Sequence, residues 1–97
     1  MLVRIVRMHF KKKHMDDFLK LFHKISPTIR NFKGCRHLEL LRDYNDESIF
    51  ITYSYWEDEE ALEGYRSSDF FKESWATTKL YFQDKPQVFS FKRFLVV

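Results

Sequence analysis

The stretch that decides the fold is CRHLELLRDYNDESIFITYSYW, residues 35–56. Both of its ends are rich in branched and aromatic residues, and a polar run separates them. The pattern predicts a strand from Cys35 to Asp43, a turn from Tyr44 to Glu47 and a strand from Ser48 to Trp56. Strands joined by so short a turn pair as an antiparallel hairpin. An antiparallel sheet is therefore the centre of the expected fold.

Upstream of the hairpin, the sequence predicts a strand and then a long helix. Leu2 to Phe10 alternates between two faces that both carry apolar residues, and the odd-numbered face holds Val3, Ile5, Arg7 and His9. From Met15 the apolar period becomes three and four residues, which predicts an amphipathic helix ending near Gly34. Pro27 lacks a backbone N–H, so we expect a kink or a restart near Ser26. Gly34 suits the left-handed position after a helix.

Downstream of the hairpin, helical segments and a last strand are expected. Acidic residues from Glu57 to Glu60 favour the start of a helix, since they meet the positive end of its dipole. Ser67 or Ser68 is expected to cap another helix. A turn then leads into a last strand from Gln87 to Phe94.

The expected order of elements is β, α, β, β, α, β within one domain of residues 1–97. That order is the split βαβ pattern of a ferredoxin-like α+β domain, whose antiparallel sheet carries its helices on one face. The other face stays open, and aromatic strand residues would cover it when a second copy packs there. We therefore expect a homodimer formed through the open sheet face.

The composition limits the kinds of binding partner and the cellular compartment that we expect. The net charge is +3, and the one basic cluster, Lys11 to Lys13, is most simply a solvated loop after the first strand. No nucleic-acid-binding motif and no apolar run of membrane-spanning length occurs, so neither nucleic acid nor membrane is expected as a partner. Cys35 is the only cysteine and no signal peptide is apparent, which together predict a cytoplasmic protein.

Several short motifs carry a family resemblance. They are Lys24-Ile25-Ser26-Pro27-Thr28, then Gly34-Cys35, then Trp56-Glu57-Asp58-Glu59-Glu60-Ala61-Leu62, and then Ser68-Asp69-Phe70-Phe71-Lys72. In this order the sequence resembles the antibiotic-biosynthesis-monooxygenase family over nearly the whole chain. The resemblance implies a dimeric α+β barrel, in agreement with the order of elements.

The family resemblance does not imply a single activity, because members of the family differ in what they catalyse. Members oxidise polycyclic phenols or quinols with molecular oxygen and no cofactor, while others degrade haem. The polar residues typical of the quinol-oxidising branch are replaced here by Ser54, Tyr65 and Phe70. The first strand lacks the asparagine typical of haem degraders. Where that branch has a tryptophan and, ten residues later, a histidine, this chain has Tyr65 and Trp75, which argues against haem degradation.

Two polar pairs are candidates for proton transfer. A cofactor-free oxygenase needs an aromatic-lined cavity, a base that titrates near neutrality and a donor that stabilises a phenolate. His9 and Arg7 share one face of the first strand, and His37 and Glu39 share one face of the second, so either pair could point into a cavity. We favour the plainer alternative, in which Arg7 and Glu39 form a cross-strand ion pair and His9 lies in water.

Aromatic residues are candidates for substrate contact. Tyr53, Trp56, Tyr65 and Trp75, together with Arg7, are the predicted substrate-binding residues, and Tyr55 is a further pocket candidate. Core or dimer packing is the favoured role for Trp56 and Trp75. For Tyr65 packing and ligand contact are weighed about equally, which makes it the best single pocket residue.

Cysteine and histidine positions give no metal site. Cys35 is expected to be buried as a small apolar residue, although Arg36 and His37 beside it could lower its thiol pKa. His14 and His23 do not combine with a carboxylate on one helical face. We therefore predict neither a metal nor another cofactor.

The sequence leaves three functions open. The leading hypothesis is a cofactor-independent monooxygenase that binds a small aromatic or quinol-like compound in one apolar pocket between helices and sheet. His9 and His37 are its candidate catalytic residues. The alternative is a non-enzymatic ligand-binding or stress-associated dimer that lost the polar site. RNA binding through the lysine run ranks last.

Overall fold

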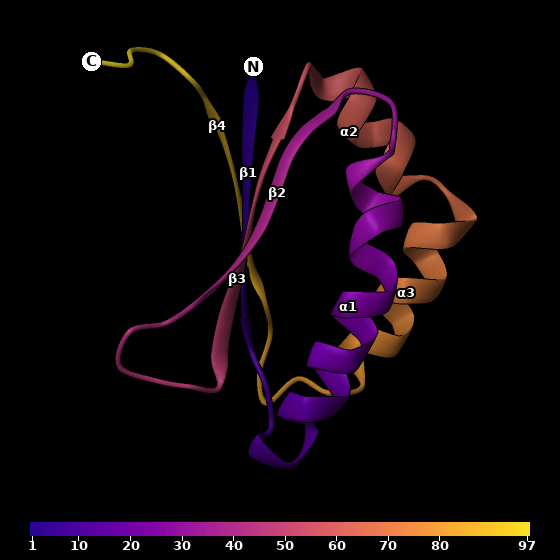
Figure 1. Cartoon of the computed structure of the whole chain (residues 1–97), viewed down its shortest axis with the longest axis vertical. Coiled ribbons are helices and arrows are strands. Elements are labelled where there is room, and N and C mark those ends of the chain that lie inside the picture. Colours follow the sequence, from indigo (N-terminus) through magenta and orange to yellow (C-terminus); the bar gives the residue numbers. More distant parts are fainter.

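The fold is a four-stranded antiparallel sheet whose helices all lie on one side (Figure 1). The computed structural model describes residues 1–97. In chain order the elements are β1 (Leu2–His9), the 3-10 turn η1 (Lys12–His14), α1 (Met15–Arg30), β2 (Cys35–Arg42), β3 (Ile49–Trp56), α2 (Glu59–Arg66), α3 (Asp69–Lys79) and β4 (Gln87–Lys92). No helix has the length and apolar character that crossing a membrane requires.

The sheet has the strand order β2-β3-β1-β4, and every neighbouring pair is antiparallel. The expected hairpin is confirmed, because β2 and β3 pair along their lengths from Cys35 opposite Trp56 to Arg42 opposite Phe50. β1 and β2 run parallel with β3 between them, which is the split βαβ arrangement. The α+β, ferredoxin-like fold predicted from the sequence is therefore confirmed.

The long helix α1 corrects one expectation. It runs without interruption from Met15 to Arg30 and contains Pro27, so the helix does not restart near Ser26, and a kink there stays a prediction. Proline frees the carbonyl four residues before it, which here belongs to the exposed residue His23. Water can satisfy that carbonyl, so the helix tolerates the proline.

Capping residues set the limits of the shorter helices. Asp58 accepts a 2.8 Å hydrogen bond from the backbone N–H of Ala61, and Ser68 accepts one of 3.1 Å from that of Phe71. Ser68, one of the two expected caps, thus begins α3. Gly34 has φ +84°, and a Cβ at this position would collide with Ala61, so glycine is required twice over.

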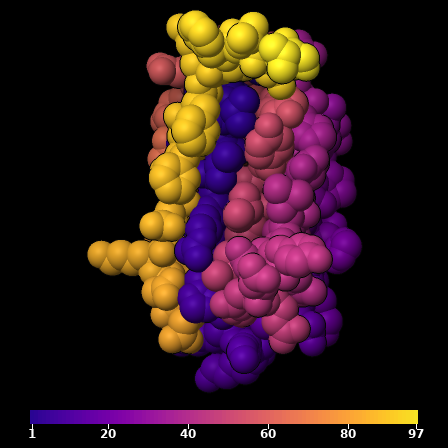
Figure 2. Space-filling model, turned by 90° about the vertical axis from the view of Figure 1, so that its left-hand side faces the viewer, coloured from indigo at the N-terminus to yellow at the C-terminus, as the bar shows by residue number.

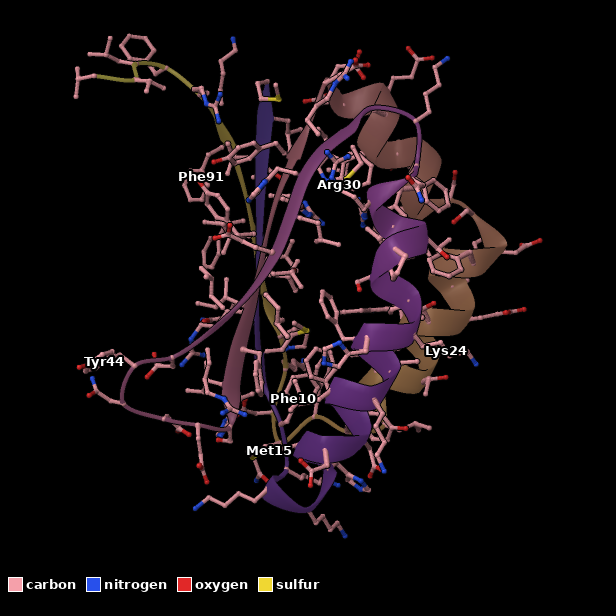
Figure 3. The ribbon with its side chains drawn as sticks, viewed as in Figure 1. Phe10, Met15, Lys24, Arg30, Tyr44 and Phe91 are labelled. Carbon is pink, nitrogen blue, oxygen red and sulfur yellow. The ribbon has the colours of Figure 1, made fainter.

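Alternation along the strands gives the sheet two different faces. Phe10, which follows β1, is 1% exposed and lies between sheet and helices, whereas Phe91 of β4 is 51% exposed and lies on the other side (Figure 3). Figure 2 shows the strands side by side on that second face with no helix above them. We call the two surfaces the helix face and the open face.

The ends of the outer strands differ slightly from expectation. β1 ends at His9, and Phe10 makes only an isolated bridge with Phe82. β4 ends at Lys92 rather than at Phe94, and residues 93–97 continue away from the helices (Figure 1). Lys11 to Lys13 are exposed as expected, although part of this segment forms the 3-10 turn.

Candidate functional site

A pocket of about 370 Å³ lies between the helix face of the sheet and the three α-helices. This volume is within the range of small-molecule sites. Thirteen of the 19 lining residues are apolar or aromatic, namely Val6, Met8, Phe18, Phe22, Ile25, Ile29, Leu38, Trp56, Leu62, Tyr65, Phe71, Trp75 and Val88. The sequence-based expectation of one apolar pocket between helices and sheet agrees with this geometry.

Two separate core clusters hold the pocket walls. One is built around Met8, Phe10, Phe18 and Phe50, and the other around Ile29, Cys35, Trp56 and Leu62. Both clusters contribute residues to the pocket lining. The pocket therefore lies where the two clusters meet, and close packing on either side fixes its shape.

Aromatic stacking orders one wall of the pocket. Trp56 is buried at the end of β3, and its indole Nε1 donates a 3.0 Å hydrogen bond to the Oγ of Ser54. Its ring stacks on Tyr65 of α2 at 5.2 Å between centroids and 17° between planes. On α3, Phe71 and Trp75 stack at 5.9 Å and 12°. These rings present flat surfaces that suit a planar aromatic ligand.

The tyrosine of this wall stays neutral. Burial, and secondarily the charge of Cys35, raise the pKa of Tyr65 well above its ordinary value of 10.0. A neutral phenol keeps its proton and can donate a hydrogen bond to a ligand oxygen. Tyr65 is therefore a donor in the pocket and is not a base.

The charged side chains of the pocket lining are Arg4 of β1 and Arg66 of α2. The guanidinium of Arg4 donates a 2.8 Å hydrogen bond to the Oγ of Ser90 on the neighbouring strand. Burial lowers the pKa of Arg4, and the positive charge of Arg66 lowers it further. No aspartate, glutamate, histidine or lysine lines the pocket.

The predicted substrate-binding residues divide between the two faces of the sheet. Trp56, Tyr65 and Trp75 line the pocket, whereas Arg7 and Tyr53 lie on the open face. The reason is the two-residue period of a strand: Arg7 and Tyr53 occupy odd-numbered positions, and the pocket is lined from even-numbered positions of β1 and β3. Ligand contact by these five residues stays a prediction.

The candidate catalytic histidines do not point into this pocket. His37 sits opposite Tyr55 on the open face, and its Nε2 lies 2.7 Å from the Oε2 of Glu39. His9 lies 3.0 Å from a carboxylate oxygen of Asp84. Neither polar pair therefore points into the helix-face pocket, because strand alternation places both pairs on the open face. A catalytic role for either histidine stays a prediction, and it would need a site on the open face.

The expected ion pair between Arg7 and Glu39 is wrong. β3 lies between the strands that carry the two residues, so they are not cross-strand neighbours. Arg7 instead donates a long, 3.4 Å hydrogen bond to the side-chain carbonyl of Gln87. On the same face a 3.2 Å hydrogen bond joins the hydroxyls of Tyr53 and Tyr55 and raises the pKa of Tyr53.

Cys35 behaves as a buried apolar residue. Its side chain belongs to the second core cluster, and burial raises the pKa of its thiol. The carbonyl of Cys35 accepts a 2.7 Å hydrogen bond from Arg30, labelled in Figure 3 at the end of α1. No set of three or more His, Cys, Asp or Glu side chains is grouped to hold a metal ion.

The two pocket arginines are the residues that our sequence reasoning missed. Arg4 shares its strand face with Leu2, Val6 and Met8, so its even-numbered position among apolar residues was a usable signal. A charge at a core-facing position is uncommon and marks a special environment. Arg66 gave no such signal, because it ends a helix where basic residues are common.

Taken together, the fold and the pocket define a small ferredoxin-like α+β domain with an aromatic-lined pocket between helices and sheet. Residues 1–76 match the model of the family described as "Antibiotic biosynthesis monooxygenase", which is most of the chain. The chain therefore belongs to the antibiotic biosynthesis monooxygenase family, and its fold is that of the subunit in the family's dimeric α+β barrels. No curated protein sequence matches the chain.

Solved structures confirm the fold. A crystal structure of an antibiotic biosynthesis monooxygenase is 20% identical with a TM-score of 0.91, and the alignment covers 98% of this chain and 100% of that one. A conserved protein from Methanosarcina mazei Go1 is 18% identical with a TM-score of 0.90, over 96% and 93% of the two chains. A putative antibiotic biosynthesis monooxygenase from Deinococcus radiodurans is 12% identical with a TM-score of 0.91, over 100% and 96%. At these identities the likeness concerns the fold alone.

Proposed function

We propose that this protein is a cofactor-independent monooxygenase that oxidises a small aromatic or quinol-like compound in the helix-face pocket. The observation that carries the proposal is the aromatic-lined pocket of about 370 Å³ in a chain of the antibiotic biosynthesis monooxygenase family. A pocket of this size accommodates a fused-ring aromatic molecule.

The proposed reaction balances without an added reductant. A quinol and O₂ give a hydroxyquinone and water, and the substrate supplies all four electrons that O₂ accepts. The substrate first loses a hydroxyl proton, and the anion passes an electron to O₂. The two radicals then combine at a ring carbon, and loss of water completes the product. The protein's task is to favour the anion and to exclude bulk water.

Pocket residues would perform that task in three ways. The stacked rings of Trp56, Phe71 and Trp75 would hold the substrate plane, and neutral Tyr65 would donate to a substrate oxygen. Positive charge from the two arginines would lower the pKa of a bound phenol. No residue of the lining has the ordinary chemistry of a base, so the proton would leave to water at the pocket mouth.

One observation favours a second candidate function. Because the pocket lining holds no histidine and no carboxylate, a non-enzymatic ligand-binding or stress-associated homodimer uses the same pocket without turnover. Ser54 illustrates the change: the resemblance implies that the quinol-oxidising branch often has a glutamate two residues before the tryptophan of the third strand, whereas here Ser54 holds that position and accepts the hydrogen bond of Trp56. The two functions differ in oxygen consumption and agree in ligand binding.

The proposed assembly is a homodimer through the open face, with cytoplasm as the proposed compartment. Exposed apolar residues gather on that face, including Leu41, Phe89 and Phe91, and Tyr53 and Tyr55 lie among them. A monomer rarely leaves such a patch in water. Pairing two open faces would bury it and would leave one pocket in each subunit.

Oxygen uptake tests the proposed function. Purified protein, incubated in air with a panel of phenols and quinols, should consume O₂ and form a hydroxylated or quinone product, measured by an oxygen electrode and mass spectrometry. Ser74→Phe fills the pocket and should abolish uptake, while Ala76→Phe, on the same helix but outside the lining, should retain it. Binding of panel compounds without oxygen uptake, while a family enzyme is active, would establish the non-enzymatic alternative.

A further inference from the structure

The charged side chains that line the pocket are all positive. Its lining contains the guanidinium groups of Arg4 and Arg66 and no acidic side chain. The two are close enough that the charge of Arg66 lowers the pKa of Arg4. Like charges beside an apolar cavity are unfavourable unless an anion compensates them.

The nearest partners do not supply that anion. Arg4 is half-buried, and its side-chain hydrogen bond is to the neutral hydroxyl of Ser90. Arg66 lies 3.8 Å from Glu63 on the surface, a distance at which an exposed pair contributes little. By contrast, Arg36 forms a close ion pair with Glu57. The pocket arginines therefore keep unused capacity to bind an anion.

One of the two arginines, Arg66, lies at the exposed rim of the pocket. The side chain of Arg66 is 46% exposed and Val88 of β4 is 43% exposed, although both also line the pocket. The rim of the pocket therefore reaches the surface beside β4, whose residues are all exposed. Met8 and Phe18, which also line the pocket, are each only 2% exposed.

We propose that the pocket binds an aromatic ligand carrying one anionic oxygen group, with its rings among Trp56, Phe71 and Trp75 and its anion on Arg4 and Arg66. Guanidinium groups suit this task because they stay charged and their planar donors match carboxylate and phenolate oxygens. The inference rests on the proposed function for the use of the pocket as the substrate site. It adds the position of the substrate's anionic group and extends the substrate class from phenols to aromatic carboxylates.

Binding of matched naphthalene derivatives tests the inference without turnover. The probes are naphthoate, its neutral amide naphthamide, and naphthol, titrated by isothermal calorimetry. Trp56 and Trp75 are the only tryptophans and both line the pocket, so quenching of tryptophan fluorescence reports its occupancy independently. Naphthoate should bind at least about tenfold more tightly than naphthamide, as expected for hydrogen bonds to a charged group.

Arginine variants locate the anion. Arg4→Gln and Arg66→Gln should each weaken naphthoate binding by about tenfold and leave naphthamide binding unchanged. Arg4→Lys, which keeps the charge, should recover part of the loss. Arg36→Gln is the matched control, because it removes an arginine that pairs with Glu57 and does not line the pocket, and it should bind naphthoate like the unaltered protein. Circular dichroism confirms that each variant is folded.

The outcomes separate the two anion chemistries and the two proposals. Preference for naphthoate at neutral and alkaline pH assigns a carboxylate, whereas naphthol binding that strengthens as pH rises toward the ionisation pH of free naphthol assigns a phenolate. Equal binding of naphthoate and naphthamide, or full naphthoate affinity in both Arg4→Gln and Arg66→Gln, would overturn the inference. Arginine-dependent binding with no oxygen uptake from any panel compound would overturn the monooxygenase proposal alone.

Discussion

The two faces of one sheet have opposite characters. On the helix face, residues such as Met8 and Trp56 are buried, and the remaining space forms an aromatic-lined pocket with two arginines. On the open face, Phe89 and Phe91 are exposed, and polar groups pair locally, as His37 does with Glu39. A single set of strands thus forms a pocket on one side, which is the proposed ligand site, and an exposed apolar surface on the other, which is the proposed dimer interface.

Whether a residue of β1 or β3 has an even or an odd number decides which face of the sheet it occupies, and therefore which surface it can serve. Arg4 and Arg7 lie on the same strand, yet the first lines the pocket and the second donates to Gln87 on the open face. A strand sends successive side chains to opposite faces, so residue type alone does not assign a residue to a site. Substitutions matched for chemistry and differing in face should therefore have different consequences.

The largest expected effect comes from the helix-face core. Phe10→Ala removes a ring that is 1% exposed and stacks on Phe18 at 4.1 Å, so the free energy of unfolding should fall by about 3–5 kcal/mol. Urea denaturation followed by circular dichroism measures the change. The loss should be the same at all protein concentrations. A cost below about 1 kcal/mol would show that this cluster is not the core.

On the open face, the expected effect is on association. Phe91→Asp places a charge in the proposed dimer interface and should weaken the dimer by about 2 kcal/mol or more, measured by sedimentation equilibrium. Leu80→Asp is the matched control, since Leu80 is 70% exposed at the end of α3, and it should leave the dimer intact. A stable Phe91→Asp dimer would place the interface elsewhere.

The pH dependence of the free energy of unfolding at alkaline pH should show that Tyr65 is buried and neutral. The pKa of Tyr65 is raised, so above about pH 10 the unfolded chain loses this proton while the native protein keeps it. The free energy of unfolding should therefore fall as pH rises above that value. Tyr65→Phe lacks the titrating group and should show a shallower fall in urea titrations between about pH 9 and 11. Equal slopes for both proteins would contradict a buried, neutral Tyr65.

The smallest expected effect concerns the open-face histidines. If the helix-face pocket is the only substrate site, His9→Gln and His37→Gln should each change the oxygen-uptake rate by less than about threefold, because neither residue lines that pocket. A loss of about a hundredfold, typical of a missing general base, would instead place the chemistry on the open face.

Much of the fold could be predicted from the sequence because its signals are local. The hairpin between Cys35 and Trp56 shows in its apolar runs and polar turn, and Ser68 and Gly34 show in capping preferences. The uninterrupted helix across Pro27 could not be predicted, since it depends on whether the freed carbonyl meets water.

The site was harder to predict than the fold because it depends on which face meets the helices. Tyr65 and Trp75 could be chosen as pocket residues from their aromatic character on helices. His37 and Tyr53 were chosen by chemistry, and they lie on the face that the helices do not cover. Arg4 could have been found from its apolar neighbours, whereas its proximity to Arg66 exists only in the folded chain.

A crystal structure of the protein with naphthoate bound would test most directly whether the helix face of the sheet is the ligand site. We predict that the rings lie between Trp56 and Trp75 and that the carboxylate lies within hydrogen-bond distance of Arg4 and Arg66. Density for the ligand on the open face, beside His37 and Tyr53, with the helix-face pocket empty, would contradict this assignment.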